Sequence, residues 1–332
     1  MKERKSVFSL IGALLGMLCL ILDSASASRS AADALELCLR TVIPCLFPML
    51  VLSAWVTSGL SGTKSAVFRG LEGFLGLPIG GGGLFLLGSV GGFPVGAQSL
   101  AQLVRAGRIS PGGAGKLLGF CNNCGPAFLF GILGCLFSEP WTPLWIFLIQ
   151  LETAAVAARM FASEEVFSTI AVENPVTLTE AVGRGVRSMT VICAWVMLAG
   201  VVNGFLIRWL FPLLPDTAGR ILCGVLELTG GVLGLAAVPQ EGLRMILCAG
   251  FVCFGGICVL LQVRAVAGEA GIPMGDYLLQ KVFQGLLGAV LAAGVVKMGP
   301  WVLLLLPGAL IFWKIAVEIP GRTMYNRLGK GG

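Results

Sequence analysis

Long apolar stretches recur along the chain, and they restrict its fold more than any other feature. A helix of about 20 apolar residues can cross the hydrocarbon core of a bilayer, and it satisfies its own backbone hydrogen bonds there. Only 12% of the residues are charged and 56% are hydrophobic, whereas about a quarter of the residues in a soluble domain are charged. The sequence therefore predicts an all-α, polytopic membrane protein in contact with membrane lipid.

The apolar stretches predict eight to ten membrane elements, a range that reflects short segments broken by glycine and proline. The first stretch is either an uncleaved membrane helix or a secretory signal, because small residues follow it. The helix that contains the second stretch is expected to begin near residue 31. The predicted spans are residues 7–22, 42–55, 141–158, 188–207, 219–238, 243–263, 285–297 and 301–317.

Basic residues cluster at both ends of the chain, within residues 2–5 and again within residues 314–330. Lys and Arg concentrate on the cytoplasmic side of membrane proteins. Both termini are therefore predicted to be cytoplasmic, in a multi-pass protein of the cell membrane. The basic residues form no stripe interleaved with aromatic side chains, so a nucleic-acid partner is not expected.

The sequence offers no recognisable catalytic or metal-binding constellation. The absence of His rules out imidazole ligands and His-based proton transfer. Most of the 11 Cys lie in apolar stretches, where Cys packs as a small hydrophobe. Cys121 and Cys124 have the spacing of half a zinc site, but no second pair follows at ligand spacing. No nucleophile–base pair occurs either, so we predict a protein that is not an enzyme and has no resident cofactor.

Two interruptions rich in glycine, proline and asparagine lie in the first half, at residues 91–96 and 122–126. Pro removes a backbone donor and Gly disfavours regular helix, so the helices should break there. The apolar residues 84–90 are too few to span and predict a half-helix or re-entrant hairpin. Between the interruptions, Ser110 is expected to cap a helix that begins at Pro111. Broken backbone persists in lipid only beside protein or a water-filled cavity, so a solute-binding cavity is predicted.

The chain divides at a polar connection rich in Ser, Thr, Glu, Asn and Pro. The predicted domains are an N-terminal membrane helix (1–30), a first repeat (31–158), the connection (159–180), and a second repeat with C-terminal helices and tail (181–332).

Weak internal similarity supports two pseudo-symmetric repeats. Residues 34–41 align with residues 181–188, and farther on Gly96 aligns with Gly256 in a segment that also pairs Gln102 with Gln262. Repeats with interrupted helices typically enclose a solute and coupling-ion site at their interface. The expected coupling ion, if the protein uses one, is Na⁺ or H⁺.

Four motifs coincide with interrupted segments: GFPVGA at residues 92–97, FCNNCGPAF at 120–128, LELTGG at 226–231 and FGG at 254–256. Together they resemble the nucleoside-recognition (Gate) domain of the sporulation integral membrane proteins of the YlbJ type, over about residues 31–300. The resemblance implies a fold similar to the concentrative nucleoside transporters, with two hairpin-bearing repeats around a small-molecule site. The sequence departs from the family at two positions. A small polar residue such as Thr is expected at Cys121, and Ser is expected at Cys258.

The same resemblance implies a role in spore formation. Sporulation members of the family move dipicolinic acid, which in a spore former would place this chain in the outer forespore membrane. The predicted partners are a small-molecule solute and lipid. The sequence leaves open whether the chain also binds a second copy of itself or other sporulation membrane proteins.

Three polar side chains near the interruptions are the leading candidates for solute or ion binding. Asn122 and Asn123 either bind polar groups of a solute or cap the broken helix ends. Glu227 lies inside an apolar stretch, where a carboxylate is costly and commonly functional. It either binds a coupling ion or proton, or pairs with an arginine such as Arg187 or Arg220.

The remaining candidates surround the same interruptions. Gln102 and Gln262 either bind solute or form hydrogen bonds between helices. Arg105 and Arg108 either attract an anionic solute or anchor the chain at the cytoplasmic face. The residues expected to shape the hairpin tips are Ser89, Gly92, Pro94, Thr229, Gly255 and Gly256.

These features favour a permease that moves a small anionic or nucleoside-like solute by alternating access, with dipicolinic acid as the implied solute. The alternative is a non-transporting scaffold or sensor of the sporulation membrane that uses the same fold.

Overall fold

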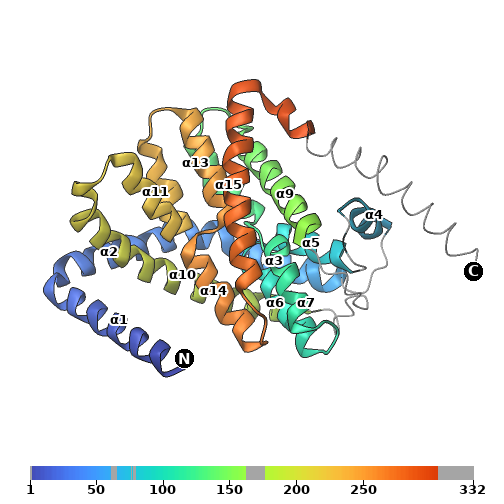
Figure 1. Cartoon of the computed structure of the whole chain (residues 1–332), viewed down its shortest axis with the longest axis horizontal. Helices are drawn as coiled ribbons and strands as arrows, with labels where there is room; N and C mark the ends of the chain where they lie inside the picture. The colour runs from blue at the N-terminus through green and yellow to red at the C-terminus, as the bar shows by residue number, and fades with distance from the viewer. Residues whose placement is uncertain (1, 61–65, 76, 78–79, 162–175, 306–332) are drawn as a thin grey trace, which may run out of the picture.

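The computed structural model describes residues 2–60, 66–75, 77, 80–161 and 176–305 (Figure 1). These residues form helices and short connections, with no strand among them. The prediction of an all-α chain is therefore confirmed for this part of the protein.

The helices before the polar connection include several short ones, as the interruptions predict. In chain order they are α1 (Lys2–Leu22), α2 (Ser24–Leu37), the π-helix η1 (Cys38–Val42), α3 (Ile43–Leu60), α4 (Ala66–Leu75), α5 (Gly81–Gly91), α6 (Val95–Arg105), α7 (Pro111–Cys121), α8 (Pro126–Gly131), the 3-10 turn η2 (Leu133–Leu136) and α9 (Thr142–Phe161).

The helices after the connection repeat this mixture of long and short elements. They are α10 (Leu178–Trp209), η3 (Phe211–Leu213), α11 (Asp216–Leu226), α12 (Leu228–Gly234), η4 (Leu235–Ala237), α13 (Glu241–Phe254), α14 (Gly256–Glu269), α15 (Gly275–Met298) and η5 (Pro300–Leu304).

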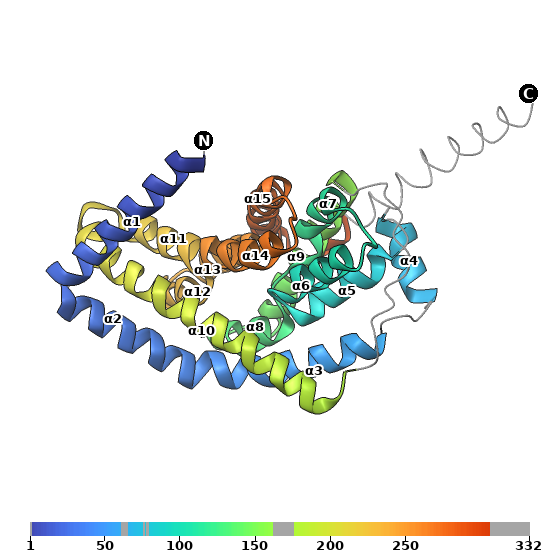
Figure 2. The same ribbon diagram turned by 90° about the horizontal axis from the view of Figure 1, so that it is seen from below.

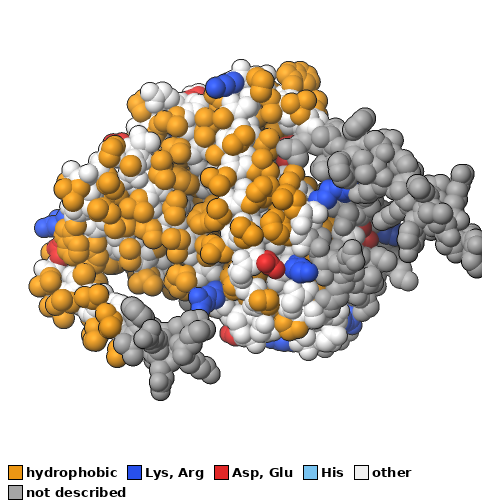
Figure 3. Space-filling model, viewed as in Figure 1, with side chains coloured by type: hydrophobic (Ala, Val, Ile, Leu, Met, Phe, Trp, Pro, Cys, Tyr) orange, Lys and Arg blue, Asp and Glu red, His pale blue; other side chains and the backbone are white. Residues whose placement is uncertain are grey.

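Five described helical segments are long and apolar enough to cross a membrane. Many side chains on their outer faces are exposed and apolar, as Figure 3 shows for one face of the molecule. On α15, for example, Leu286 and Val290 are 68% and 66% exposed. A surface this apolar is suited to lipid rather than water, which indicates a membrane-embedded protein. The segments are Ser24–Leu52, Thr142–Phe161, Leu178–Trp209, Glu241–Glu269 and Gly275–Met298.

Several predicted spans have different boundaries in the structure. The helix expected to begin near residue 31 already begins at Ser24, after a single break at Asp23, whose φ of −133° is not helical. The stretch 219–238 is not one helix, because Glu227 separates α11 from α12. The predicted span 243–263 lies within the membrane-length segment Glu241–Glu269, which Gly255 interrupts. Conversely, 285–297 is the second half of one long helix, α15. Most of the last predicted span, 301–317, lies outside the described residues.

Local capping signals in the sequence are realised at two helix starts. The Ser110 hydroxyl accepts the Gly113 N–H at 3.0 Å, with Pro111 at the first position of α7, which confirms the predicted cap. Thr177 and Glu180 form a capping box at the start of α10. Residues 162–175 of the predicted connection lie outside the described part of the chain.

The helices are arranged around two large packed cores, with two smaller ones where α3 meets α10. One core lies among α5, α6, α7, α9 and α14, and the other among α8, α9, α12, α13 and α15. The Phe93 ring packs against both cores. Along one side, α10 packs across α2 and α3, so the N-terminal helices contact the second half of the chain (Figure 2).

Candidate functional site

The two interruptions of the first half are in direct backbone contact. The α5–α6 hairpin turns at Gly92, while α7 and α8 are separated by residues 122–125. A Cβ atom built on Gly88 of α5 would lie 1.5 Å from the carbonyl oxygen of Cys121, and one on Gly96 of α6 would lie 1.8 Å from it. The hairpin can therefore straddle the end of α7 only because both positions are glycine.

The two interruptions of the second half reach the same place. Gly255 separates α13 from α14 with a φ of +89°, a conformation that favours glycine. A Cβ on Gly255 would lie 3.0 Å from Cζ of Phe93, and one on Gly256 would lie 3.3 Å from the backbone nitrogen of Leu228. Leu228 begins α12 directly after Glu227. All four interruptions thus gather around the Phe93 ring.

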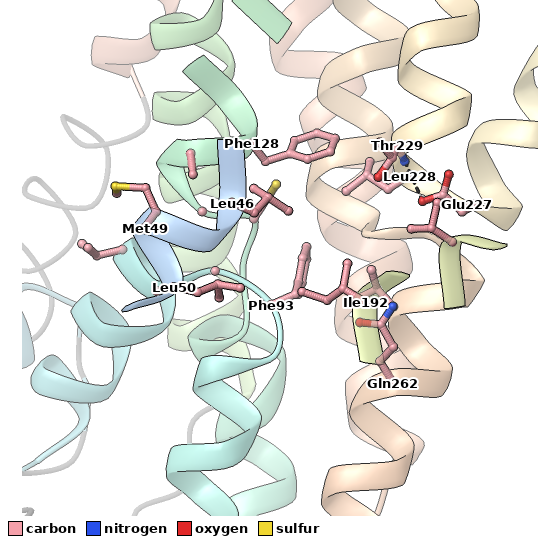
Figure 4. Close-up of a pocket in the computed structure, with 18 residues that line it drawn as sticks. Leu46, Met49, Leu50, Phe93, Phe128, Ile192, Glu227, Leu228, Thr229 and Gln262 are labelled. Carbon is pink, nitrogen blue, oxygen red and sulfur yellow. Dashed lines mark hydrogen bonds between the residues drawn. The ribbon is translucent and has the colours of Figure 1, made fainter. Parts of the chain in front are cut away.

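A pocket with about 70 Å³ of water-accessible space opens at this meeting point (Figure 4). Its wall is mostly apolar, with Leu46 and Met49 of α3 facing Leu228 of α12 across the pocket and Phe93 between them. We call it the central pocket. Its lining residues are Leu46, Met49, Leu50, Val90, Gly91, Gly92, Phe93, Cys124, Gly125, Ala127, Phe128, Ile192, Val196, Glu227, Leu228, Thr229, Val259 and Gln262.

A larger and more polar cleft, with about 520 Å³ of water-accessible space, adjoins the central pocket and shares Gln262 with it. Arg184 and Arg187 line it from α10, and neither forms a salt bridge with a described carboxylate. Arg105 of α6 is paired with Glu269 of α14 at 2.9 Å. We call this the arginine cleft. Its lining residues are Pro94, Gln98, Ala101, Gln102, Arg105, Arg184, Arg187, Ser188, Val191, Gln262, Ala265, Val266 and Glu269.

The structure separates the predicted site residues into three groups. Gly92, Glu227, Thr229 and Gln262 line the central pocket. Pro94 and Gln102 line the arginine cleft, again with Gln262. The other candidates lie behind these walls in packed surroundings: Ser89, Asn122, Asn123, Gly255 and Gly256.

Asn122 and Asn123 are fully buried and do not line either cavity. The Asn123 amide donates to the Phe120 carbonyl at 2.7 Å, so it caps the end of α7, and it also donates to Ser89 at 3.3 Å. The Asn122 amide donates to the Tyr277 hydroxyl at 3.0 Å. Both asparagines therefore tie the α7–α8 interruption to its neighbours rather than face a solute in this conformation.

Lys281 contacts the α7–α8 interruption, and the sequence patterns did not predict this. It is fully buried on α15, and its Nζ donates to Oδ1 of Asn123 at 3.2 Å and to Oε1 of Gln284 at 2.9 Å. The Phe93 ring lies beside it, with 5.5 Å from Nζ to the ring centroid. The only signal in the sequence is a lysine flanked by Gln280 and Gln284 at the start of an apolar stretch, a pattern that also fits an exposed amphipathic helix.

A second contact holds the far side of the α7–α8 interruption. The fully buried Gln150 of α9 accepts the Cys124 N–H at 3.0 Å and donates to the Cys124 carbonyl at 2.8 Å. This two-point contact satisfies backbone groups that the missing helical turn leaves unpaired. The described residues include no group of three or more Cys, Asp or Glu side chains arranged to hold a metal ion.

Glu227 is 5% exposed and caps α12. Its carboxylate accepts the N–H groups of Thr229 at 2.8 Å and Gly230 at 2.5 Å. The expected arginine partner is not found, because Arg220 pairs with Asp216 instead and no described cation forms a salt bridge with Glu227. The carboxylate is therefore held by helix N–H groups at the edge of the central pocket.

We predict that Glu227→Ala lowers the free energy of unfolding by about 1 kcal/mol, the usual value of an N-cap. Thermal unfolding of the purified protein in detergent measures the change. The control is Glu36→Ala, which removes only an exposed salt bridge to Arg40 and should have a smaller effect. Equal effects of the two substitutions would show that the cap contributes nothing.

Comparison with family models, curated proteins and solved structures found no significant match.

Proposed function

We propose that the protein is a membrane permease that moves a small anionic or nucleoside-like solute by alternating access. The observation that carries this proposal is the meeting of four helix interruptions, two from each half, around Phe93 and one pocket. Interrupted helices are tolerated inside a membrane where their free backbone groups face protein or a cavity. In many transporters the solute site lies between two such halves.

The order of elements supports two structural repeats. The first half contains the α5–α6 hairpin, the interrupted α7–α8 helix and the long α9; the second contains the α11–α12 hairpin, the interrupted α13–α14 helix and the long α15. This order differs from the sequence alignment that pairs Gly96 with Gly256. Gly96 lies in a hairpin and Gly256 in an interrupted helix, so the element order pairs Gly92 with Glu227 and Gly125 with Gly255 instead.

The arginine cleft supports an anionic solute. Arg184 and Arg187 are three residues apart on α10, so their side chains share one face of the helix. The amides of Gln98, Gln102 and Gln262 line the same cleft and offer further hydrogen bonds. Guanidinium groups bind carboxylates in a two-point geometry. Dipicolinic acid, the solute implied by the family resemblance, carries two carboxylates on an aromatic ring and has the charge that this cleft would attract.

The test is uptake by proteoliposomes that contain only this chain, measured with dipicolinate, nucleosides and nucleobases. We expect uptake of the dicarboxylate, and a decrease of about tenfold or more in Arg184→Gln/Arg187→Gln, because each charge-assisted hydrogen bond contributes about 1.5–3 kcal/mol. Arg40→Gln, an exposed arginine outside the cleft, serves as the control. Unchanged uptake in the double variant would rule out the cleft as the binding site.

The alternative is a non-transporting scaffold or sensor of the sporulation membrane. It agrees with a solute that binds in the arginine cleft and does not pass through the central pocket, since about 70 Å³ admits water but no aromatic solute in this conformation. A sensor would bind solute without accumulating it inside vesicles. Solute binding by calorimetry together with no uptake would therefore support the sensor over the permease.

A further inference from the structure

Lys281 is a buried cation with no buried anion beside it among the described residues. It is fully buried, and no described carboxylate forms a salt bridge with it. Burial of an unpaired charge is costly, so a lysine at this position needs an explanation other than packing.

The neighbours of Lys281 present oxygen atoms to it, and their orientation is fixed by the backbone. The Asn123 amide nitrogen donates to the Phe120 carbonyl, and the Gln284 amide nitrogen donates to the Gly119 carbonyl at 3.1 Å. A carbonyl can only accept a hydrogen bond. Both amide groups must therefore turn their oxygen atoms toward Nζ of Lys281, as the structure has them.

The position of this ammonium group is one that favours a cation. Gly119 and Phe120 are in the last turn of α7, where the helix dipole concentrates partial negative charge. The face of the Phe93 ring adds a further attraction for positive charge. In transporters with interrupted helices, such half-helix ends together with unwound backbone coordinate a coupling Na⁺.

We propose that the ammonium group of Lys281 takes the place that a Na⁺ ion would otherwise occupy at the α7–α8 interruption. The interruption is then stabilised without bound Na⁺. The conclusion that transport does not require Na⁺ rests on the proposed permease function. The conclusion that Lys281 stabilises the end of α7 in place of Na⁺ does not depend on transport.

Thermal unfolding of the purified full chain in detergent tests whether Lys281 stabilises the end of α7 in place of Na⁺. The wild type is expected to have the same midpoint in NaCl and in choline chloride. Lys281→Ala should unfold several degrees lower in choline chloride, and NaCl or propylammonium chloride should restore part of the loss because the amide oxygens of Asn123 and Gln284 face the vacated space. Lys281→Met fills the space without a charge, so it should be destabilised without cation-dependent recovery. Lys297→Ala, an exposed lysine on the same helix, is the matched control.

Three results would overturn the proposal. They are a wild-type midpoint that rises specifically with Na⁺, a Lys281→Met protein as stable as the wild type, and a Lys281→Ala protein that neither Na⁺ nor propylammonium restores. Uptake by proteoliposomes in Na⁺ or choline buffer is then a separate measurement, with no Na⁺ requirement expected for the wild type. If no solute is taken up, the permease function fails, while the unfolding experiment still decides the role of Lys281.

Discussion

Gly96→Val is expected to prevent stable folding, and Gly88→Val is expected to do the same. In each case the new Cβ would lie within 2 Å of the carbonyl oxygen of Cys121, at 1.8 Å and 1.5 Å respectively. The obstacle is backbone at the end of α7, which cannot rotate away as a side chain can. Overpacking of a core typically costs about 1–3 kcal/mol, and a clash with backbone on this scale should cost at least the upper value.

The measurement is the yield of monodisperse protein in detergent and its unfolding midpoint. Gly183→Val on α10 is the control, since a Cβ there meets no described residue within 4 Å, and it should change the free energy of unfolding by less than about 1 kcal/mol. If Gly96→Val and Gly183→Val behave alike, then α6 does not rest on the end of α7 as the structure has it.

Asn123→Leu is expected to destabilise the protein by about 3–5 kcal/mol, well above the effect of Asn122→Leu. Removal of the Asn123 oxygen takes one of two amide acceptors from the buried Lys281, and a hydrogen bond to a charged group contributes about 1.5–3 kcal/mol. Removal of its amide nitrogen also leaves the buried Phe120 carbonyl without this donor. A buried polar group that loses its partner costs about 1–3 kcal/mol more.

Asn122 is the natural comparison because it is adjacent, equally buried and of the same type. Its amide makes one neutral hydrogen bond, to Tyr277, and its oxygen has no hydrogen-bond partner among the described residues. Asn122→Leu should therefore cost about 1 kcal/mol. Denaturant or thermal unfolding of both variants measures the difference, and an Asn122 effect equal to or larger than that of Asn123 would contradict the arrangement around Lys281.

The sequence alone determined that the chain is helical, that it is apolar enough for a membrane, and where the first-half helices break. These properties are local: apolar length sets whether a helix can span, and Gly, Pro and caps such as Ser110 set where it begins and ends. Apolar length alone predicts continuous spans over residues 219–238 and 243–263, because neither Glu227 nor Gly255 prevents a helix by itself. The interruptions there are indicated only by the motifs at residues 226–231 and 254–256.

Only the tertiary structure decided which side chains meet. Asn123 and Lys281 are 158 residues apart in the chain, and no local pattern indicates that α15 brings this lysine to the end of α7. Packing also directs Asn122 and Asn123 away from both cavities, whereas Arg184 and Arg187 of α10 line the arginine cleft. A polar residue on a helix can face lipid, solute or a neighbouring helix with the same local sequence, so the choice among these depends on contacts between distant segments.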